Sequence, residues 1–134
     1  MSSKPQPGDV PLPALLTAVD QFNAGEYYAA HETLEELWLE EEGPLRSLYQ
    51  GILQVGVGLY HWGRGNYPGA DALLERGLTL LGSFRLTSLG LDIDRLIADA
   101  AAAHAELRQL GPRRMARYES ARFPRIHFLP PNEE

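Results

Sequence analysis

Hydrophobic residues recur at helical spacing along most of the chain. A first apolar stripe lies between residues 13 and 23, and Pro13 suits the first turn of a helix. A second stripe runs from about Glu26 to Glu42 and stops at "GP", Gly43 and Pro44. We expect one helix over each segment. The two stripes are Leu15, Leu16, Val19 and Phe22, then Tyr27, Ala30, Leu34, Leu37 and Trp38.

The third helical segment, roughly Leu45 to Arg64, is apolar nearly all round, which is typical of a buried central helix. Gly51, Gly56 and Gly58 each cost about 1 kcal/mol relative to alanine inside a helix. We interpret them as points where a neighbouring helix packs closely. A fourth helix is expected over about Tyr67 to Phe84.

After a connector, "RLTSLGLD", Asp92 is suited to cap a fifth helix, which "LGPRR" should break. The segment "RFPRIHFLPP" indicates an extended C-terminal arm. Phe123, Ile126 and Phe128 of this arm are expected to dock on the bundle.

An internal repeat relates the second and fourth helical segments. "GEYYAAHETLE" and "GNYPGADALLE" align without gaps 40 residues apart. This predicts two helical hairpins of similar build, close to tetratricopeptide packing, although two copies are too few for a solenoid. We therefore predict an all-α fold: a compact bundle of about five helices, built from two helical hairpins plus a fifth helix and the arm. The domain should span 12–128, with mobile ends at 1–11 and 129–134.

Composition narrows the class of protein. A chain of 134 residues has the size of one domain. The absence of cysteine excludes disulfides and thiolate sites. No apolar run approaches the roughly 20 residues needed to span a bilayer, and the first residues lack the plan of a secretory signal. We expect a cytoplasmic protein that does not enter membranes.

Charge is unevenly distributed. The net charge is −6, yet Glu26 to Glu42 holds seven glutamates and no lysine or arginine, whereas Arg113 to Phe128 holds five arginines against one glutamate. The acidic balance of the chain disfavours nucleic-acid binding. We expect the basic arm to lie against the acidic helix, or against that of a partner. Phosphate binding by the arm is the alternative.

Polar residues on the second helical segment form a candidate site. His31 and Glu35 are four residues apart and share a face with Trp38, while Glu32 and Glu36 share the neighbouring face. "HETLE" lacks the second histidine that the zincin motif requires. A His–Glu pair at this spacing still offers two metal ligands.

The third helical segment places Gln50, Gln54 and His61 in one stripe. If the two segments form an antiparallel hairpin, His31 and Gln54 lie at similar depth from the turn, and His61 lies one to two turns deeper. A cluster of His31, Glu35, Gln54 and His61 is therefore expected, with Glu32 within range.

Three interpretations of this cluster stay open. It can be a satisfied hydrogen-bond network that fixes helix register. It can be a divalent-metal site formed by His31, Glu35 and His61. It can also be a small-molecule pocket or hydrolytic site with Glu32 or Glu35 as the base. Among the other polar residues, His104 is expected to be a core or seam histidine, His127 a surface or docking residue, and Asn66 a helix cap.

The strings "FNAGEYYAAHETLEELW", "GPLRSLYQGILQVGVGLYHWGRGN" and "GADALLERGLTLL" resemble the DUF309 family of bacterial and archaeal proteins, a domain of unknown function. "LGLDIDRL" and "FPRI" add to the resemblance, which covers roughly residues 12–128. It implies an all-helical bundle and no established activity. The positions that it marks are His31, Glu32, Glu35, Trp38, Gln50, Gln54, His61 and Asn66.

Two functions are therefore considered. The first is a protein-interaction or scaffold module with a buried His/Glu/Gln cluster, acting on a protein partner or as a homodimer. The second is a metal-dependent or small-molecule-binding enzyme, hydrolase-like, centred on His31, Glu35 and His61. An open cleft that reaches His31 would favour the second function, and a dry, fully paired cluster would favour the first.

Overall fold

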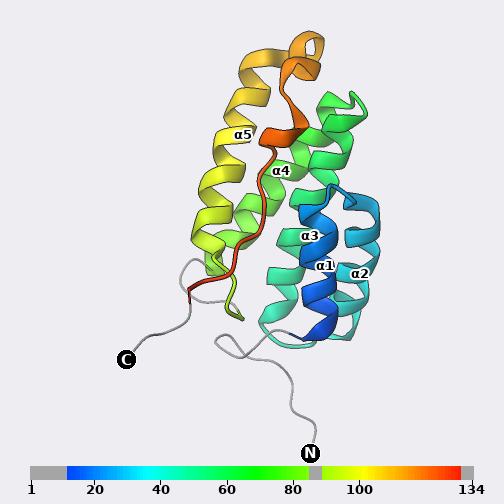
Figure 1. The fold of residues 1–134 in the computed structure, drawn as a ribbon, viewed down its shortest axis with the longest axis vertical. Coiled ribbons are helices and arrows are strands. Elements are labelled where there is room, and N and C mark those ends of the chain that lie inside the picture. The colour runs from blue at the N-terminus through cyan, green and yellow to red at the C-terminus, as the bar shows by residue number, and fades with distance from the viewer. Residues whose placement is uncertain (1–11, 85–88, 131–134) are drawn as a thin grey trace, which may run out of the picture.

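The computed structural model describes residues 12–84 and 89–130, which form five α-helices and three short 3-10 turns. The predicted all-α bundle with its extended arm is confirmed (Figure 1). The predicted segment 1–11 and the last four residues of the predicted tail lie outside the described residues. The elements are α1 (Pro13–Asn23), α2 (Tyr27–Glu40), α3 (Leu45–Gly63), α4 (Tyr67–Leu81), η1 (Gly82–Phe84), α5 (Ile93–Arg114), η2 (Met115–Arg117) and η3 (Ser120–Arg122).

The helix ends follow local hydrogen bonding. α2 stops two residues before the predicted end because Glu41 adopts an extended backbone and its Oε2 accepts a hydrogen bond from the Gly43 N–H at 2.8 Å. Such a side-chain bond offers the backbone an alternative to the helix. Asp92 caps α5 as predicted, accepting from the Arg95 N–H at 3.1 Å. The predicted break in "LGPRR" occurs at Gly111, whose φ is 72°.

The internal repeat is visible in both interhelical turns. Gly25 and Gly65 have φ values of 80° and 77°, a region that favours glycine. The residue after each glycine donates its N–H to the carbonyl five positions earlier, at 2.9 Å and 2.8 Å. The two hairpins therefore share one turn geometry. The equivalent core pairs, Ala30 with Ala70 and Leu34 with Leu74, are all buried.

Close packing of α3 against α4 explains the glycines of the central helix. A Cβ atom on Gly51 would lie 2.9 Å from the Leu81 side chain, and one on Gly58 would lie 3.0 Å from Leu74 Cγ. α4 contributes a glycine of its own, because a Cβ on Gly77 would lie 2.7 Å from Val55 Cγ2. The predicted reason is confirmed for Gly51 and Gly58, whereas a Cβ on Gly56 would meet the Phe22 ring of α1 at 3.4 Å, an ordinary van der Waals distance.

The C-terminal arm lies beside α1 and α5 (Figure 1). The Asn23 side chain donates to the Ile126 carbonyl at 2.9 Å and accepts from the Ile126 N–H at 2.7 Å. Phe123 and Ile126 are buried, as expected. Phe128 is 47% exposed and does not dock, because the end of the arm is held by backbone bonds to residues 90–92 that leave the ring in solvent.

The arm does not follow the acidic helix. Among the described residues, no ion pair joins its arginines to the glutamates of α2, because the Asn23 clamp directs the arm along α1 and α5 instead. The arm touches α2 at Tyr27, whose ring centroid lies 6.3 Å from that of Phe123, but the expected course of the basic arm against the acidic face of this chain's own helix is wrong. None of the described helices has both the length and the apolar character needed to cross a membrane.

Candidate functional site

A pocket of about 170 Å³ lies between α2 and α3, at the end of the hairpin opposite its connecting turn. Its walls are mostly aromatic, and the Tyr28 ring lies 5.9 Å from that of His31 and 6.1 Å from that of Tyr60, between centroids. The pocket is thus a small ring-lined cavity with few polar groups. Its lining residues are Tyr27, Tyr28, His31, Val57, Tyr60 and His61.

Helix geometry explains why these two histidines share the pocket. Side chains lean toward the N-terminus of their own helix. In an antiparallel hairpin, the His31 side chain therefore leans away from the turn, and that of His61 leans toward it. Gln54 also leans toward the turn and does not line the pocket. The sequence-based prediction paired His31 with Gln54 because their backbones lie at similar distances from the turn, and it did not take the direction of the side chains into account.

His31 is half-buried, and its Nδ1 atom is buried without a hydrogen-bond partner among residues 12–84 and 89–130. Gln54 Oε1 is a second buried atom with no partner, so the two side chains do not bond to each other. Leaving a buried polar atom unsatisfied costs about 1–3 kcal/mol, and native structures contain few such atoms. The expected polar cluster is therefore not a fully paired network.

His61 is held by the residue that caps the next helix. Asn66 Oδ1 accepts the Gly69 N–H at 3.1 Å, which leaves the amide NH₂ of Asn66 facing His61 Nδ1 at 3.2 Å. The amide then donates to Nδ1, so the neutral imidazole carries its proton on Nε2. Asn66 is a helix cap as predicted, and it also orients one wall of the pocket.

The remaining predicted site residues lie elsewhere. Glu32 and Glu35 are exposed, and neither lines the pocket. Gln50 is half-buried outside it. Trp38 is half-buried beneath the guanidinium of Arg46, 4.4 Å from the ring centroid. Only His31 and His61 of the predicted set come together.

A metal site gains no support from this arrangement. Within residues 12–84 and 89–130, no group of three or more histidine, aspartate or glutamate side chains is placed to hold an ion. His31 and His61 share a pocket, but the exposed Glu35 does not join them. The predicted carboxylate–imidazole set is thus incomplete.

A second polar cluster, between α4 and α5, was not predicted from the sequence. Asp71 Oδ1 lies 2.7 Å from His104 Nε2 and accepts a hydrogen bond from Arg108 Nε at 2.7 Å, while Arg108 donates to Glu75 at 2.6 Å. The bonds from Arg108 and His104 hold the pKa of Asp71 below its usual value. His104 is the buried seam histidine that was expected.

The internal repeat contained the signal for this cluster. Asp71 and Glu75 stand 40 residues after His31 and Glu35, so the same helix positions are polar in both copies. In the second hairpin the next helix supplies partners for them. In the first hairpin the following helix, α3, supplies no hydrogen-bond partner to His31 Nδ1 among the described residues. The ring-lined pocket lies between α2 and α3 at this position.

Comparison with known proteins identifies relatives without an assigned role. The chain is 37% identical over 75 residues to the uncharacterized protein YpuF of Bacillus subtilis, covering 54% of this chain and 43% of that protein. It is 31% identical over 74 residues to an uncharacterized protein of Aquifex aeolicus, covering 52% of this chain and 22% of that protein. The matches thus span less than half of either relative. No solved structure matches the chain.

The family resemblance is confirmed over part of the expected range. The domain of unknown function DUF309 matches residues 15–73, from α1 to the middle of α4. This range includes both histidines of the pocket and Asn66, whereas α5 and the arm lie outside it. Residues 15–73 of this chain are therefore similar to the DUF309 family.

Proposed function

We propose that this protein binds a small planar organic molecule in the pocket between α2 and α3. The observation that carries the proposal is the ring-lined cavity, whose wall includes His31, a residue whose buried Nδ1 has no hydrogen-bond partner among the described residues. If the His31 ring turns to bring Nδ1 to the cavity, a ligand group that hydrogen-bonds to this atom would remove the cost of leaving it unsatisfied. The repeat-equivalent Asp71 shows that such a position can be fully paired within the chain.

The size and walls of the pocket define the ligand. A cavity of about 150 Å³ is known to accept one benzene molecule, so about 170 Å³ suits one ring. Tyrosine and histidine rings offer offset or edge-on contacts to a planar ligand. The pocket is lined by two histidines and three tyrosines and by no carboxylate, which favours an uncharged ring bearing one hydrogen-bonding group.

Binding is favoured over hydrolysis by the position of the glutamates. A general base must come within hydrogen-bond reach of the proton that it removes. Glu32 and Glu35 are exposed and outside the pocket, so neither is placed for that role. The function proposed is therefore recognition, with His31 as the polar contact.

Titration with phenol and benzene, followed by the imidazole NMR signals, tests this function. The chain has four histidines, and His104 and His127 lie outside the pocket, so their signals serve as internal controls. Phenol should shift the His31 and His61 signals saturably. It should bind about 2- to 10-fold more tightly than benzene, the value of one net hydrogen bond.

The variant His31→Leu should bind phenol and benzene equally, because it keeps the apolar wall and removes the polar atom. Val57→Trp should block both probes by filling the pocket. Shifts that never saturate, or that affect all four histidines alike, would contradict ligand binding. Near-stoichiometric metal in untagged protein that disappears in His31→Ala would establish the metal site instead.

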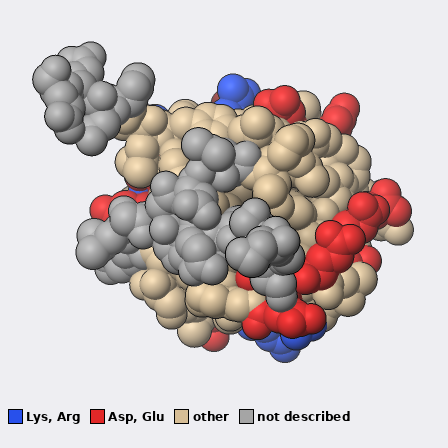
Figure 2. All heavy atoms as spheres, turned by 90° about the horizontal axis from the view of Figure 1, so that it is seen from below, with Lys and Arg blue, Asp and Glu red and all other residues tan. Residues whose placement is uncertain are grey.

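A protein-interaction role is the second candidate, supported by the surface of α2. Leu39 and Tyr28 are 63% and 60% exposed on a helix that also presents Glu32, Glu35 and Glu36 to solvent. Figure 2 shows acidic side chains gathered along the side of the molecule where α2 lies. A basic amphipathic helix would complement this surface, as would a second copy that buries the apolar residues. Sedimentation equilibrium of wild type and Leu39→Lys tests the homodimer, since an interface through Leu39 would be lost in the variant.

A further inference from the structure

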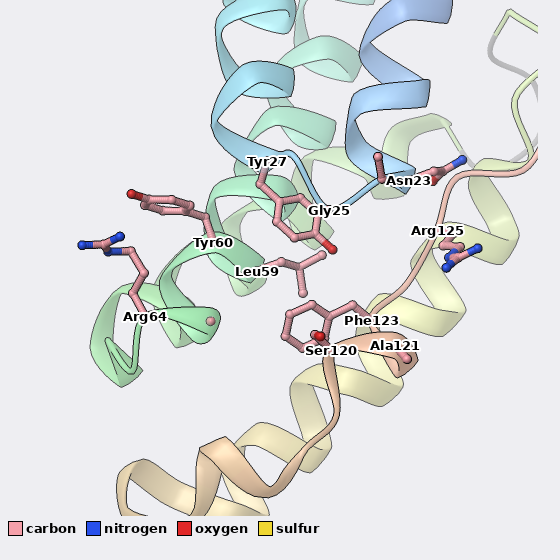
Figure 3. Close-up of a pocket in the computed structure, with 12 residues that line it drawn as sticks. Asn23, Gly25, Tyr27, Leu59, Tyr60, Arg64, Ser120, Ala121, Phe123 and Arg125 are labelled. Atoms are coloured by element: carbon pink, nitrogen blue, oxygen red, sulfur yellow. The ribbon is translucent and has the colours of Figure 1, made fainter.

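A larger cleft of about 520 Å³ adjoins the ring-lined pocket and shares Tyr27 and Tyr60 with it (Figure 3). The cleft lies where the first interhelical turn, the end of α3 and the C-terminal arm meet. The arm contributes Ser120, Phe123 and Arg125 to its wall. The volume falls within the usual range for small-molecule sites.

The lining of this cleft is cationic, although the chain as a whole is acidic. It contains Arg64 and Arg125 and no aspartate or glutamate. In Figure 3 these two side chains lie on opposite sides of the cleft. Neither forms an ion pair with a carboxylate of the described residues, whereas Arg108 forms ion pairs with two carboxylates, those of Asp71 and Glu75. Arg64 is held over the Tyr60 ring, 5.4 Å from its centroid.

The other polar groups of the cleft can donate hydrogen bonds. Burial raises the pKa of Tyr27 to about 12, and nearby Arg125 only partly offsets this effect. The hydroxyl of Tyr27 therefore stays protonated at neutral pH. Ser120 adds a second hydroxyl. Guanidinium groups bind carboxylates and phosphates through paired N–H donors, so donors of this kind without a competing carboxylate suit an anion.

We infer that the cleft binds the anionic group, phosphate or carboxylate, of a small ligand whose ring occupies the adjoining pocket. This inference rests on the proposed function for the position of the ring. Arg64 and Arg125, on opposite sides of the cleft, attract the anion, and Tyr27 and Tyr60 line both the cleft and the pocket. The ligand class is thus an aryl phosphate or an aryl carboxylate.

Phenyl phosphate, benzoate and phenol are suitable probes, since they share one ring and differ in charge. We expect wild-type protein to bind phenyl phosphate or benzoate at least about tenfold more tightly than phenol, the value of a charge-assisted hydrogen bond. The probe whose affinity exceeds that of phenol by the larger factor identifies whether phosphate or carboxylate is the preferred anionic group. Added salt should reduce this gain and leave phenol binding unchanged.

The double variant Arg64→Gln/Arg125→Gln should lose the preference for anions and retain phenol binding. Both arginines are exposed, so the fold should tolerate the change. Arg76→Gln/Arg117→Gln is the matched control, because it removes the same charge from exposed residues outside the cleft. Its preference should equal that of wild type.

Equal binding of the anionic and neutral probes by wild type would overturn the inference. So would a preference that survives Arg64→Gln/Arg125→Gln or is lost equally in the control. The two proposals fail separately. Absence of phenol binding, with an arginine-dependent affinity for phenyl phosphate, contradicts the ring pocket and leaves the anion cleft supported.

Discussion

At the scale of single residues, the two hairpins differ in how one polar position is satisfied. Asp71 receives hydrogen bonds from His104 and Arg108 across the α4–α5 seam. His31, its equivalent in the first hairpin, has a buried nitrogen that finds no partner in the part of the chain that the structure describes. The second position is therefore paired within the chain, whereas the first leaves a buried polar atom unpaired among the described residues.

Asp71→Asn should lower the free energy of unfolding at neutral pH by about 1 kcal/mol, since a charged acceptor is lost at a site that solvent partly screens. Because folding lowers the pKa of Asp71, its stabilising effect is fully present above the ordinary value of 3.8 and is lost as the pH falls through the folded value. Urea unfolding of wild type and variant between neutral and acidic pH measures this difference.

Glu75→Gln is the control for that measurement, because Glu75 bonds only to the exposed side of Arg108. It should change stability by less than about 0.5 kcal/mol. An effect of Asp71→Asn that matches the control, or that persists undiminished at acidic pH, would show that the paired carboxylate does not stabilise the fold.

At the scale of helices, α3 and α4 approach each other closely around Gly77. Gly77→Ala should destabilise the protein by about 1–3 kcal/mol, because the new Cβ would lie 2.9 Å from the Gly51 carbonyl oxygen and the Val55 nitrogen, and backbone cannot move aside cheaply. The cost of this close contact outweighs the gain of about 1 kcal/mol in helix propensity that alanine brings. Thermal unfolding measures the change.

Gly82→Ala provides the comparison, since a Cβ at Gly82 meets no atom within 4 Å and its φ of −55° suits alanine. This variant should be neutral or slightly stabilised. Destabilisation of both variants to the same extent would mean that backbone freedom, and not contact between helices, accounts for Gly77.

The helices could be predicted from the sequence because their signals are local. Apolar spacing and the glycine and proline positions fix each element within a few residues. The site was only partly predictable, since it depends on contacts between helices. Periodicity put Glu35 on the same face as His31, but it could not show that Glu35 lies far enough round α2 to reach solvent. Asp71 and Arg108, 37 residues apart, meet only because of how α5 returns along α4.

At the scale of the whole molecule, the C-terminal arm connects the fold to the proposed cleft. It is clamped to the end of α1 by Asn23 and carries Arg125 and Ser120 to the cleft wall. Trp62 Nε1 donates to the Met115 carbonyl at 2.9 Å, which fixes the start of the arm. Docking of the arm and anion binding are therefore expected to be coupled.

Asn23→Ala should release the arm locally. Loss of two hydrogen bonds to the backbone of Ile126, worth about 1–2 kcal/mol together, should speed hydrogen exchange of the Ile126 amide about 5- to 30-fold. Phenyl phosphate should bind this variant more weakly, and phenol should bind it as it binds wild type. Gln21→Ala removes a bond to Thr33 within the α1–α2 hairpin and should alter neither property of the arm. If exchange at Ile126 accelerates while phenyl phosphate binding is unchanged, the arm does not take part in the anion site, and Arg64 alone would have to account for any preference that remains.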